Sequence, residues 1–305
     1  MSGTSPDLSV VVPLHNEAGN LFSLYQEIKE TLDQSGLTYE IIFVNDASTD
    51  NTPKLLREIK QGDPLVRIIQ HKVNYGEAAA LSSGSLFSRG DIIVTMDGDG
   101  QNDPRDIPSL VKKIKEGYKA ATGWRKRRQE KYLTRILPSV VANWIISVIT
   151  GVHVHDNGCG LKAYDAKVAR GVIIPHGFHR FLPAVLGVKS DQVAEVRVSD
   201  RRRIYGQSHY GLSRTKEVIR ELVTFRFMLH EPKSWVPRFR FLSFLAAGIA
   251  TVLFGLALVN RHPLPLIGAL GCLGLTFVFR MICQNLKRVI TIREKMAFQR
   301  EEVGE

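Results

Sequence analysis

The 305-residue chain has few cysteines and lacks the common signatures of nucleotide-binding and zinc-binding proteins. Its three cysteines, Cys159, Cys272 and Cys283, do not have the spacing of a metal site, and two of them lie in an apolar segment near the end of the chain. No Gly-x-Gly-x-x-Gly follows the first predicted strand, and no Walker lysine motif is present. The sequence therefore argues against an ordinary dinucleotide or P-loop site and indicates reduced thiols in a protein that faces the cytosol.

Acidic residues are also scarce relative to basic ones. The chain holds 41 lysines and arginines against 30 aspartates and glutamates, which gives a formal net charge of +11. Such a balance favours partners that carry phosphate, or an anionic membrane surface. The chain has no nucleic-acid-binding motif, so we expect no nucleic-acid partner. Residues 1–8 are short and polar, so we also expect no signal peptide.

Two long uncharged segments lie near the end of the chain. Phe241–Val259 carries no charge over 19 residues and Pro263–Phe279 carries none over 17. A helix needs about 20 apolar residues to cross a bilayer, so the pair predicts a transmembrane hairpin, with a hairpin buried in a soluble core as the alternative. Lysines and arginines gather on both sides of the pair and only one arginine lies in the turn. The positive-inside rule therefore predicts that both ends lie in the cytoplasm.

A predicted strand near residue 95 is followed by an acidic loop. Ile92–Thr95 is a β-branched apolar run, and Asp97, Asp99 and Gln101 follow its carboxyl end. Ligands of open α/β sheets bind at that end of the strands, and two carboxylates with an amide suit a hard divalent cation. An EF-hand is excluded, because the glycine and the glutamate that its loop requires are absent. These residues alone leave three alternatives: a metal–diphosphate site, a plain acidic turn, and the nucleophile loop of haloacid-dehalogenase-like phosphatases.

Strand and helix patterns alternate through the first part of the chain. Apolar runs predict strands at 8–14, 39–44, 66–70, 92–95, 118–122 and 192–198. Helical spacing of apolar residues predicts helices at 18–34, 54–60 and 77–88. This order predicts an α/β fold with a mostly parallel sheet and helices on both faces, and the loops at the carboxyl ends of the strands then meet at one rim.

Four short motifs follow one another in this part of the chain: Ser9–Glu17, Val44–Thr52, Asn74–Gly76 and Asp97–Gln101. Together they resemble a family 2 glycosyltransferase with the GT-A (Rossmann-like) fold. With the C-terminal hairpin, the chain is similar to the polyprenyl-phosphate glycosyltransferases, which include dolichyl-phosphate mannose synthases and bactoprenol glucosyltransferases. The resemblance implies inverting transfer of one sugar from a UDP- or GDP-sugar to undecaprenyl or dolichyl phosphate.

The resemblance also implies roles for the polar residues of the rim. Asp97, Asp99 and Gln101 would hold Mg²⁺ or Mn²⁺ against the donor diphosphate, which makes Asp99 a catalytic residue. Asp46 would hydrogen-bond the nucleotide base, with an Asx-type helix cap as the alternative. The full donor set implied is Pro13, Asn16, Glu17, Asp46, Asp97, Arg203 and Ser208. The last two belong to a basic loop at 201–211, which would close over the diphosphate or be only a flexible basic loop.

The predicted acceptor site lies in the second half of the chain. The resemblance implies that Arg125, Arg135 and Ser139 hold the lipid phosphate, and arginine suits this role because its planar fork binds phosphate oxygens in pairs. Asp156 is the second catalytic candidate. It would act as a base or only orient the acceptor, because a phosphate monoester is largely a dianion near pH 7 and needs no base. The helical pattern at 132–150 suits the membrane interface and a packed core equally.

These segments predict four parts. We expect a cytoplasmic catalytic domain at 1–230, an interfacial linker at 231–240, a transmembrane hairpin at 241–283 and a cytoplasmic basic tail at 284–305. The protein is expected in the cytoplasmic membrane, with the lipid bilayer as a partner and a homo-oligomer left open. Two other functions stay open. One is a processive polysaccharide synthase, although the Gln-x-x-Arg-Trp motif is absent; the other is a non-catalytic membrane scaffold that binds nucleotide-sugar or lipid.

Overall fold

The structure is a computed structural model. It describes residues 5–125, 146–201, 220–221, 223–225, 227, 232–260 and 263–302. The chain divides into two compact units, one within residues 1–209 and the other within residues 210–305. Four predicted site residues lie outside the described residues: Arg135, Ser139, Arg203 and Ser208.

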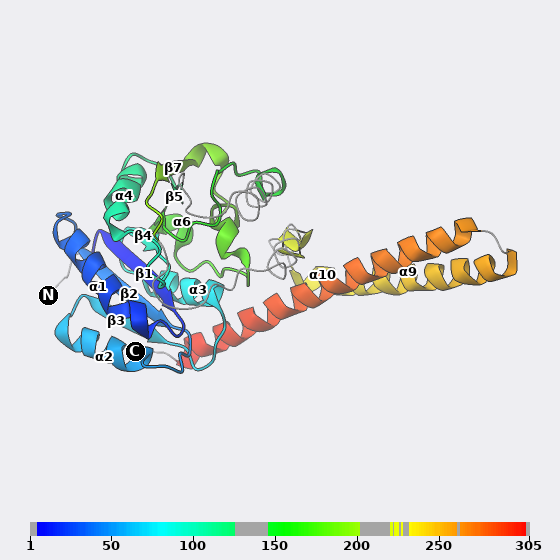
Figure 1. Ribbon diagram of the computed structural model, residues 1–305, viewed down its shortest axis with the longest axis horizontal. Helices are drawn as coiled ribbons and strands as arrows, with labels where there is room; N and C mark the ends of the chain where they lie inside the picture. The colour runs from blue at the N-terminus through cyan, green and yellow to red at the C-terminus, as the bar shows by residue number, and fades with distance from the viewer. Residues whose placement is uncertain are drawn as a thin grey trace. The chain divides into compact units, whose positions relative to one another are not determined.

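A seven-stranded sheet forms the centre of the first unit (Figure 1). Its strands are β1 (Leu8–Leu14), β2 (Tyr39–Asn45), β3 (Val66–Gln70), β4 (Ile92–Thr95), β5 (Ala120–Trp124), β6 (Lys162–Asp165) and β7 (Val193–Arg197). They are arranged in the order β3-β2-β1-β4-β6-β5-β7, and every pair of neighbours is parallel except those that include β6. The predicted α/β fold with a mostly parallel sheet is therefore confirmed.

Helices cover both faces of this sheet, which explains why β1 and β2 are almost wholly buried. The longer helices are α1 (Ala18–Asp33), α2 (Thr52–Gly62), α3 (Glu77–Phe87) and α4 (Ile107–Lys115). Apolar residues of α1, α2 and α4 pack in one core with Val10 and Val12 of β1. The side chain between these two valines, Val11, faces α3 on the opposite side, where Gly84 lets the helix approach closely. The continuous apolar run of β1 thus serves two cores.

Strand β6 was not predicted from the sequence. It is only four residues long, and its Lys162 suggests a surface position, yet this lysine is only 3% exposed. The strand lies between β4 and β5 and runs antiparallel to both, with Lys162 paired to Thr95. Because of this direction, the segment that precedes β6 lies at the carboxyl end of β4. The polar turn at 155–161 therefore reaches the same rim as Asp97.

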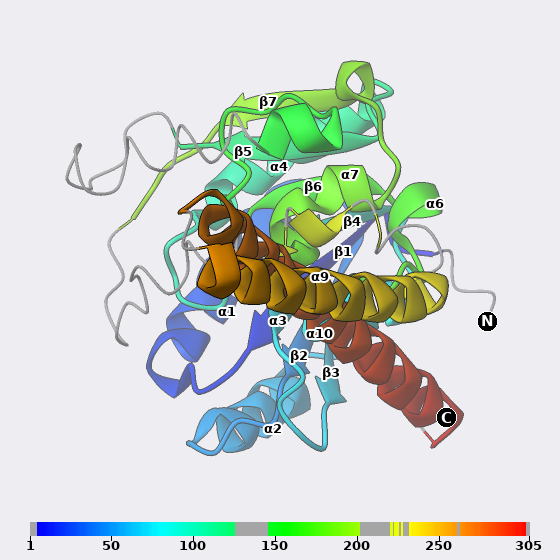
Figure 2. The same ribbon diagram turned by 90° about the vertical axis from the view of Figure 1, so that its right-hand side faces the viewer.

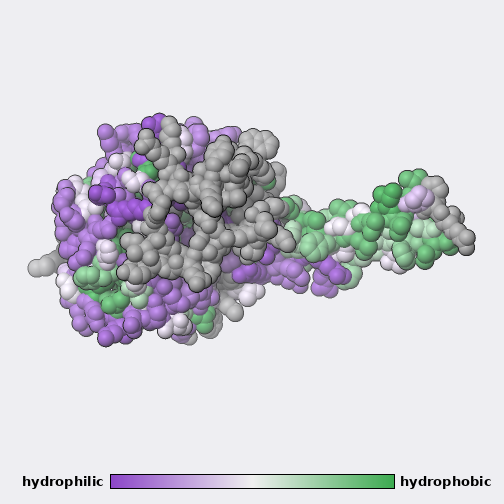
Figure 3. Space-filling model, in the orientation of Figure 1, coloured by the Kyte–Doolittle hydropathy of each residue, from purple (hydrophilic) through white to green (hydrophobic). Residues whose placement is uncertain are grey.

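The second unit consists mainly of two long helices that form a hairpin, α9 (Pro232–Asn260) and α10 (Pro263–Glu302) (Figures 1 and 2). Both are long and apolar enough to cross a membrane, and only 17% and 22% of their most apolar stretches are buried. Hydrophobic residues cover most of the hairpin surface toward its turn in Figure 3, and hydrophilic residues appear near its other end. This exposure fits membrane association and does not fit the alternative of a buried soluble hairpin.

The two helices are longer than the predicted hairpin. Residues 232–240, which we assigned to a linker, form the first turns of α9, and residues 284–302, which we assigned to a basic tail, continue α10. Pro232 is compatible with this because proline is tolerated in the first turn of a helix.

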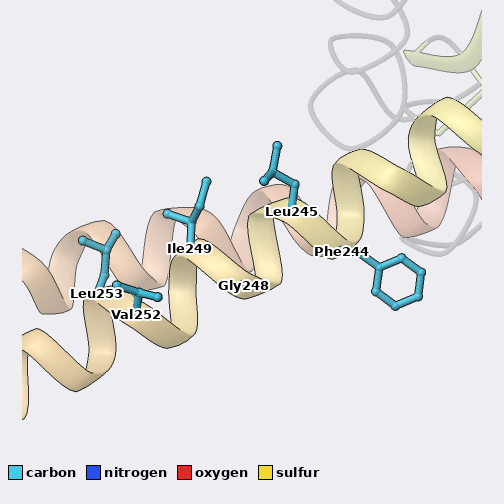
Figure 4. A pocket seen from close by; sticks show the side chains of 6 residues that line it. All are labelled: Phe244, Leu245, Gly248, Ile249, Val252 and Leu253. Atoms are coloured by element: carbon cyan, nitrogen blue, oxygen red, sulfur yellow. The ribbon is translucent and has the colours of Figure 1, made fainter.

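A shallow apolar groove lies on the outer surface of α9 (Figure 4). It is lined by Phe244, Leu245, Gly248, Ile249, Val252 and Leu253. Gly248 has no side chain, which leaves a hollow between Phe244 and Val252, one turn before and one turn after it. Such a surface suits contact with lipid chains.

Candidate functional site

The loops that follow β1 and β2 are joined by hydrogen bonds. Asn16 and Ala47 both have positive φ, 58° and 54°, a strained conformation that often marks functional loops. The Asn16 Oδ1 accepts hydrogen bonds from the backbone N–H groups of Thr49 (2.8 Å) and Asp50 (3.4 Å), and its own N–H donates to Ser48 Oγ (3.0 Å). Asn16 therefore holds the two loops together. Its predicted contact with the nucleotide stays a prediction.

Glu17 and Pro13 belong to the same end of the sheet. The Glu17 N–H donates to Thr52 Oγ1 (3.1 Å), and its Oε2 accepts from Asn20 Nδ2 (2.7 Å). A Cβ placed on Gly98 would lie only 2.9 Å from the carbonyl oxygen of Pro13. The end of β1 and the loop after β4 are thus in direct contact. Two segments that we assigned to donor and metal binding are adjacent.

The Asp46 carboxylate organises the loop in front of α3. Its Oδ1 lies 2.8 Å from His71 Nδ1 and accepts from the Tyr75 N–H (2.9 Å), and its Oδ2 accepts from the Gly76 N–H (2.7 Å). Burial alone would raise the pKa of Asp46. The hydrogen bonds lower it by more than burial raises it, so the pKa of Asp46 lies below its ordinary value. The alternative that Asp46 is an Asx-type cap of the following helix is wrong: α2 begins at Thr52, whose N–H donates to Asp50 Oδ1 (2.9 Å), whereas the Asp46 carboxylate bonds His71 and the segment before α3. His71, to which no sequence motif drew attention, is the buried hydrogen-bond partner of this carboxylate.

Replacing Asp46 by asparagine should lower the free energy of unfolding by about 1–3 kcal/mol at pH 7, because a buried charged acceptor is lost. A carboxyl whose pKa is lowered by folding stabilises the protein above its unfolded pKa of about 3.9, and this stabilisation is lost as the pH falls through the folded pKa. Thermal unfolding of wild type and D46N at pH 7 and at about pH 3 measures the difference, which should shrink at the lower pH. Asp191→Asn, at an exposed position, is the control. An equal difference at both pH values would contradict this role.

Asp97, Asp99 and Gln101 form the loop after β4. The Gln101 N–H donates to Asp99 Oδ1 (3.0 Å) and the Asp97 N–H donates to Asn102 Oδ1 (3.1 Å). Burial and the negative charges of Glu77 and Asp99 raise the pKa of Asp97 to about 7. The carboxylates of the site thus repel one another, and a bound cation would reduce this repulsion.

The donor set fits a divalent cation that is shared with a ligand. Within the described ranges, no group of three His, Cys, Asp or Glu side chains is placed to hold a metal ion by itself. Two carboxylates and an amide leave room for oxygens of another molecule, as hard cations bound to substrate phosphates require. The arrangement therefore fits a metal–diphosphate site better than a closed structural metal site.

Arg201 fastens the far end of this loop. The Arg201 backbone N–H donates to the Gln101 carbonyl (3.1 Å), and the Gln101 side-chain amide nitrogen lies 3.5 Å from the Arg201 carbonyl. The Arg201 guanidinium forms ion pairs with Asp103 (2.8 Å) and Glu27. Burial raises the pKa of Asp103, but hydrogen bonds from Arg105 and Arg201 lower it to about 2. The arginine thus connects the acidic loop to the segment that leads into the predicted basic loop.

Arg125 and Asp156, which we assigned to different roles, form one ion pair. The Arg125 Nε donates to Asp156 Oδ2 (2.8 Å), its Nη2 donates to Oδ1 (3.1 Å), and its backbone N–H also points to Oδ2 (3.3 Å). Burial lowers the pKa of Arg125, but the charge and hydrogen bonds of Asp156 raise it more, so the guanidinium stays charged. Since both Asp156 oxygens contact Arg125 and the residue is only 1% exposed, the geometry favours an orienting role over that of a free base.

Lys162 is a buried residue whose importance the sequence did not reveal. Its Nζ donates to the carbonyl oxygens of Asn157 (3.1 Å), His179 (3.4 Å) and Arg180 (3.5 Å), and burial lowers its pKa. The His179 Nε2 in turn lies 3.5 Å from Glu77 Oε2. This lysine therefore joins the turn that carries Asp156 to the segment at 178–181 and to the charges around Asp97.

Residues 9–172, more than half of the chain, match the family model described as glycosyl transferase family 2. The chain is 39% identical over 229 residues to a dodecaprenyl-phosphate galacturonate synthase of Rhizobium johnstonii, which covers 74% of this chain and 68% of that one. It is 34% identical over 257 residues to an undecaprenyl-phosphate 4-deoxy-4-formamido-L-arabinose transferase of Shewanella sediminis, with 83% and 74% of the two chains covered.

Two solved structures share the fold. A glucosyl-3-phosphoglycerate synthase of Mycobacterium tuberculosis, in complex with Mn²⁺, uridine diphosphate and glucosyl-3-phosphoglycerate, has a TM-score of 0.54 at 20% identity and covers 73% of this chain and 80% of its own. A mannosyl-3-phosphoglycerate synthase of Rubrobacter xylanophilus has a TM-score of 0.56 at 16% identity, with 73% and 74% covered. At such identities the likeness concerns the fold alone.

Proposed function

The chain belongs to glycosyltransferase family 2, and from this premise we propose that it transfers a single sugar, with inversion, from a nucleotide-sugar to a polyprenyl phosphate at the cytoplasmic face of the membrane. Both relatives described above are named for polyprenyl-phosphate acceptors. The apolar hairpin of α9 and α10 supports an acceptor that is embedded in lipid. The proposal includes cytoplasmic locations for residues 1–230 and 284–305.

The observation that carries the proposal is the position of the Arg125–Asp156 pair. Strand β6 runs antiparallel, so this pair lies at the rim where Asp97 and Asp99 follow β4. Arg125 is close enough for its charge to lower the pKa of the Asp97 carboxyl. An arginine that would bind phosphate, beside an acidic loop that fits a metal–diphosphate, suits a reaction between two phosphorylated substrates.

Different residues of the rim would bind the donor diphosphate and the lipid phosphate. A divalent cation, Mg²⁺ or Mn²⁺, held by Asp97, Asp99 and Gln101 would neutralise charge on the departing nucleoside diphosphate. Arg125, kept charged and oriented by Asp156, would hold the lipid phosphate. An oxygen of that phosphate would attack the anomeric carbon opposite the diphosphate, which inverts the configuration. Because the phosphate is largely a dianion near pH 7, the attack requires no base.

Incubation of the purified protein with polyprenyl phosphate and a panel of UDP- and GDP-sugars tests the proposal. We expect one donor to give polyprenyl-phosphate sugar with a single sugar per lipid by mass spectrometry, and chelation of divalent cations to stop the reaction. The anomeric configuration of the product, determined by NMR, should be opposite to that of the donor. Products with several sugars per lipid would indicate a processive synthase. Absence of turnover with every donor would indicate a non-catalytic scaffold.

A further inference from the structure

Gly160 lies directly against the carboxylate of Asp97. A Cβ built on Gly160 would lie 2.2 Å from each of Cγ, Oδ1 and Oδ2 of Asp97, whereas real Cβ atoms almost never approach another atom within 3.0 Å. Gly160 does not have a positive φ, unlike Gly76 or Gly100. A left-handed backbone conformation therefore does not account for glycine at this position. The reason that the structure gives for glycine is the lack of space for a Cβ.

The backbone around Gly160 is held from two sides. Thr95 Oγ1, at the end of β4, donates to the Gly160 carbonyl (3.0 Å), and the Gly123 N–H of β5 donates to the Leu161 carbonyl (3.0 Å). The next residue, Lys162, begins β6 between these two strands. Because the strands are fixed in the middle of the sheet, the backbone at Gly160 cannot retreat from an added side chain without breaking these bonds.

The main chain of Asp97 is fixed as well. The Met96 N–H donates to the Val11 carbonyl (3.1 Å), and the Asp97 N–H donates to Asn102 Oδ1 (3.1 Å). A collision with a side chain at position 160 would therefore be relieved mainly by rotation of the Asp97 side chain. The carboxylate would turn away from its present place, while the strand that carries it stayed where it is.

We propose that Gly160 is a positioning residue for the metal-binding carboxylate of Asp97. Because Gly160 has no side chain, the Asp97 carboxylate can pack directly against its backbone. The inference rests on the proposed function, because it takes Asp97 as a ligand of the cation. Groups that orient metal ligands typically contribute about 10–100-fold to metal affinity. A side chain at position 160 should cost a similar factor, without any change in the ligands themselves.

Binding of Mn²⁺ to the full chain in detergent, followed by electron paramagnetic resonance of the free ion, tests the proposal without turnover. We expect Gly160→Ala to weaken Mn²⁺ binding by about 10–100-fold. Thr95→Val, which removes the hydrogen bond that holds Gly160, should weaken it in the same direction by a smaller factor. Gly158→Ala is the matched control from the same turn, because its Cβ would make only ordinary contacts, 3.5 Å from Arg125 Nη2 and 3.6 Å from Asp156 Oδ1. Its Mn²⁺ affinity should equal that of wild type.

Asp99→Ala separates this inference from the proposed function. Wild-type affinity in both Gly160→Ala and Thr95→Val, with binding lost in Asp99→Ala, would overturn the positioning role and leave the metal site standing. Undiminished binding in Asp99→Ala would overturn the metal site itself, and with it the inference. Thermal unfolding of each variant shows whether it is folded, and Thr95→Val decides the matter if Gly160→Ala does not fold.

Discussion

Replacement of Asp99 by alanine should abolish sugar transfer, with a loss of about 10³-fold or more in kcat, because stabilisation by a cation contributes several kcal/mol and each 1.36 kcal/mol is a factor of ten. Asp99 is held by the Gln101 N–H beside the partly enclosed Asp97 carboxylate. Without it, the proposed cation site would keep only one of its two carboxylates. Transfer from the donor identified in the panel and Mn²⁺ binding should fall together.

The protein should otherwise remain intact in this variant. Asp99→Ala should still fractionate with membranes, because the hairpin of α9 and α10 is unchanged. Asp91→Ala, at an exposed position next to the opposite end of β4, is the matched control and should keep full activity. Transfer that persists in metal-free buffer, in wild type or in Asp99→Ala, would refute the mechanism.

Asp156→Ala should both destabilise the protein and remove activity. The guanidinium of Arg125, only 14% exposed, would lose the partner of its paired hydrogen bonds and keep Asp200, whose Oδ1 lies 3.7 Å from its Nη1. A buried charge left wholly without a partner costs about 3–5 kcal/mol, so we expect a loss of stability at or below the lower end of this range. Asp156→Asn keeps the shape and one acceptor oxygen, so it should lose less stability. Thermal unfolding of the two variants measures this order.

The kinetics of Asp156→Asn distinguish orientation from base catalysis. If Asp156 only holds Arg125 in place, the asparagine variant should show a raised KM for polyprenyl phosphate and an unchanged pH profile of kcat. A general base would instead give a large loss in kcat and the disappearance of an ionisation from the pH profile of wild type. The second result would contradict the role that we infer from the buried ion pair.

The strands of the first unit were predictable where burial on both faces produced a continuous apolar run. Leu8–Leu14 and Ile92–Thr95 have in the structure the bounds that the sequence indicated. The bounds of Val66–Gln70 also agree, although this strand lies at the edge of the sheet and is only partly buried. Strand β6 lacks this signal. The Lys162 ammonium donates to carbonyl oxygens of the preceding turn, at Asn157, and of the segment at 178–181, and it lies near the charge of Asp97. These contacts form only in the folded chain, so the local pattern does not indicate that Lys162 is buried.

The composition of the candidate site was predictable in part, and its partnerships were not. Asp97, Asp99 and Gln101 are adjacent in sequence, and their spacing alone suggested a site. Asp46 and His71 are separated by 25 residues, and Arg125 and Asp156 by 31. Such pairs depend on the order and direction of the strands, which local patterns do not encode. Gly160 carries no chemical group at all, so only the packing reveals it.

The antiparallel β6 has a consequence for the order in which the chain folds during synthesis. Strand β4 ends at Thr95, but its partner on the side away from β1 begins only at Lys162. At a synthesis rate of about 5–20 residues per second, the ribosome needs roughly 3–13 seconds to make the intervening chain. Until β6 is made, this edge of β4 lacks the partner that it has in the folded protein, and β5 (Ala120–Trp124), which is made earlier than β6, can pair with it. Productive folding of the nascent chain therefore requires that β5 does not pair with β4, because β6, which is made later, pairs with both strands.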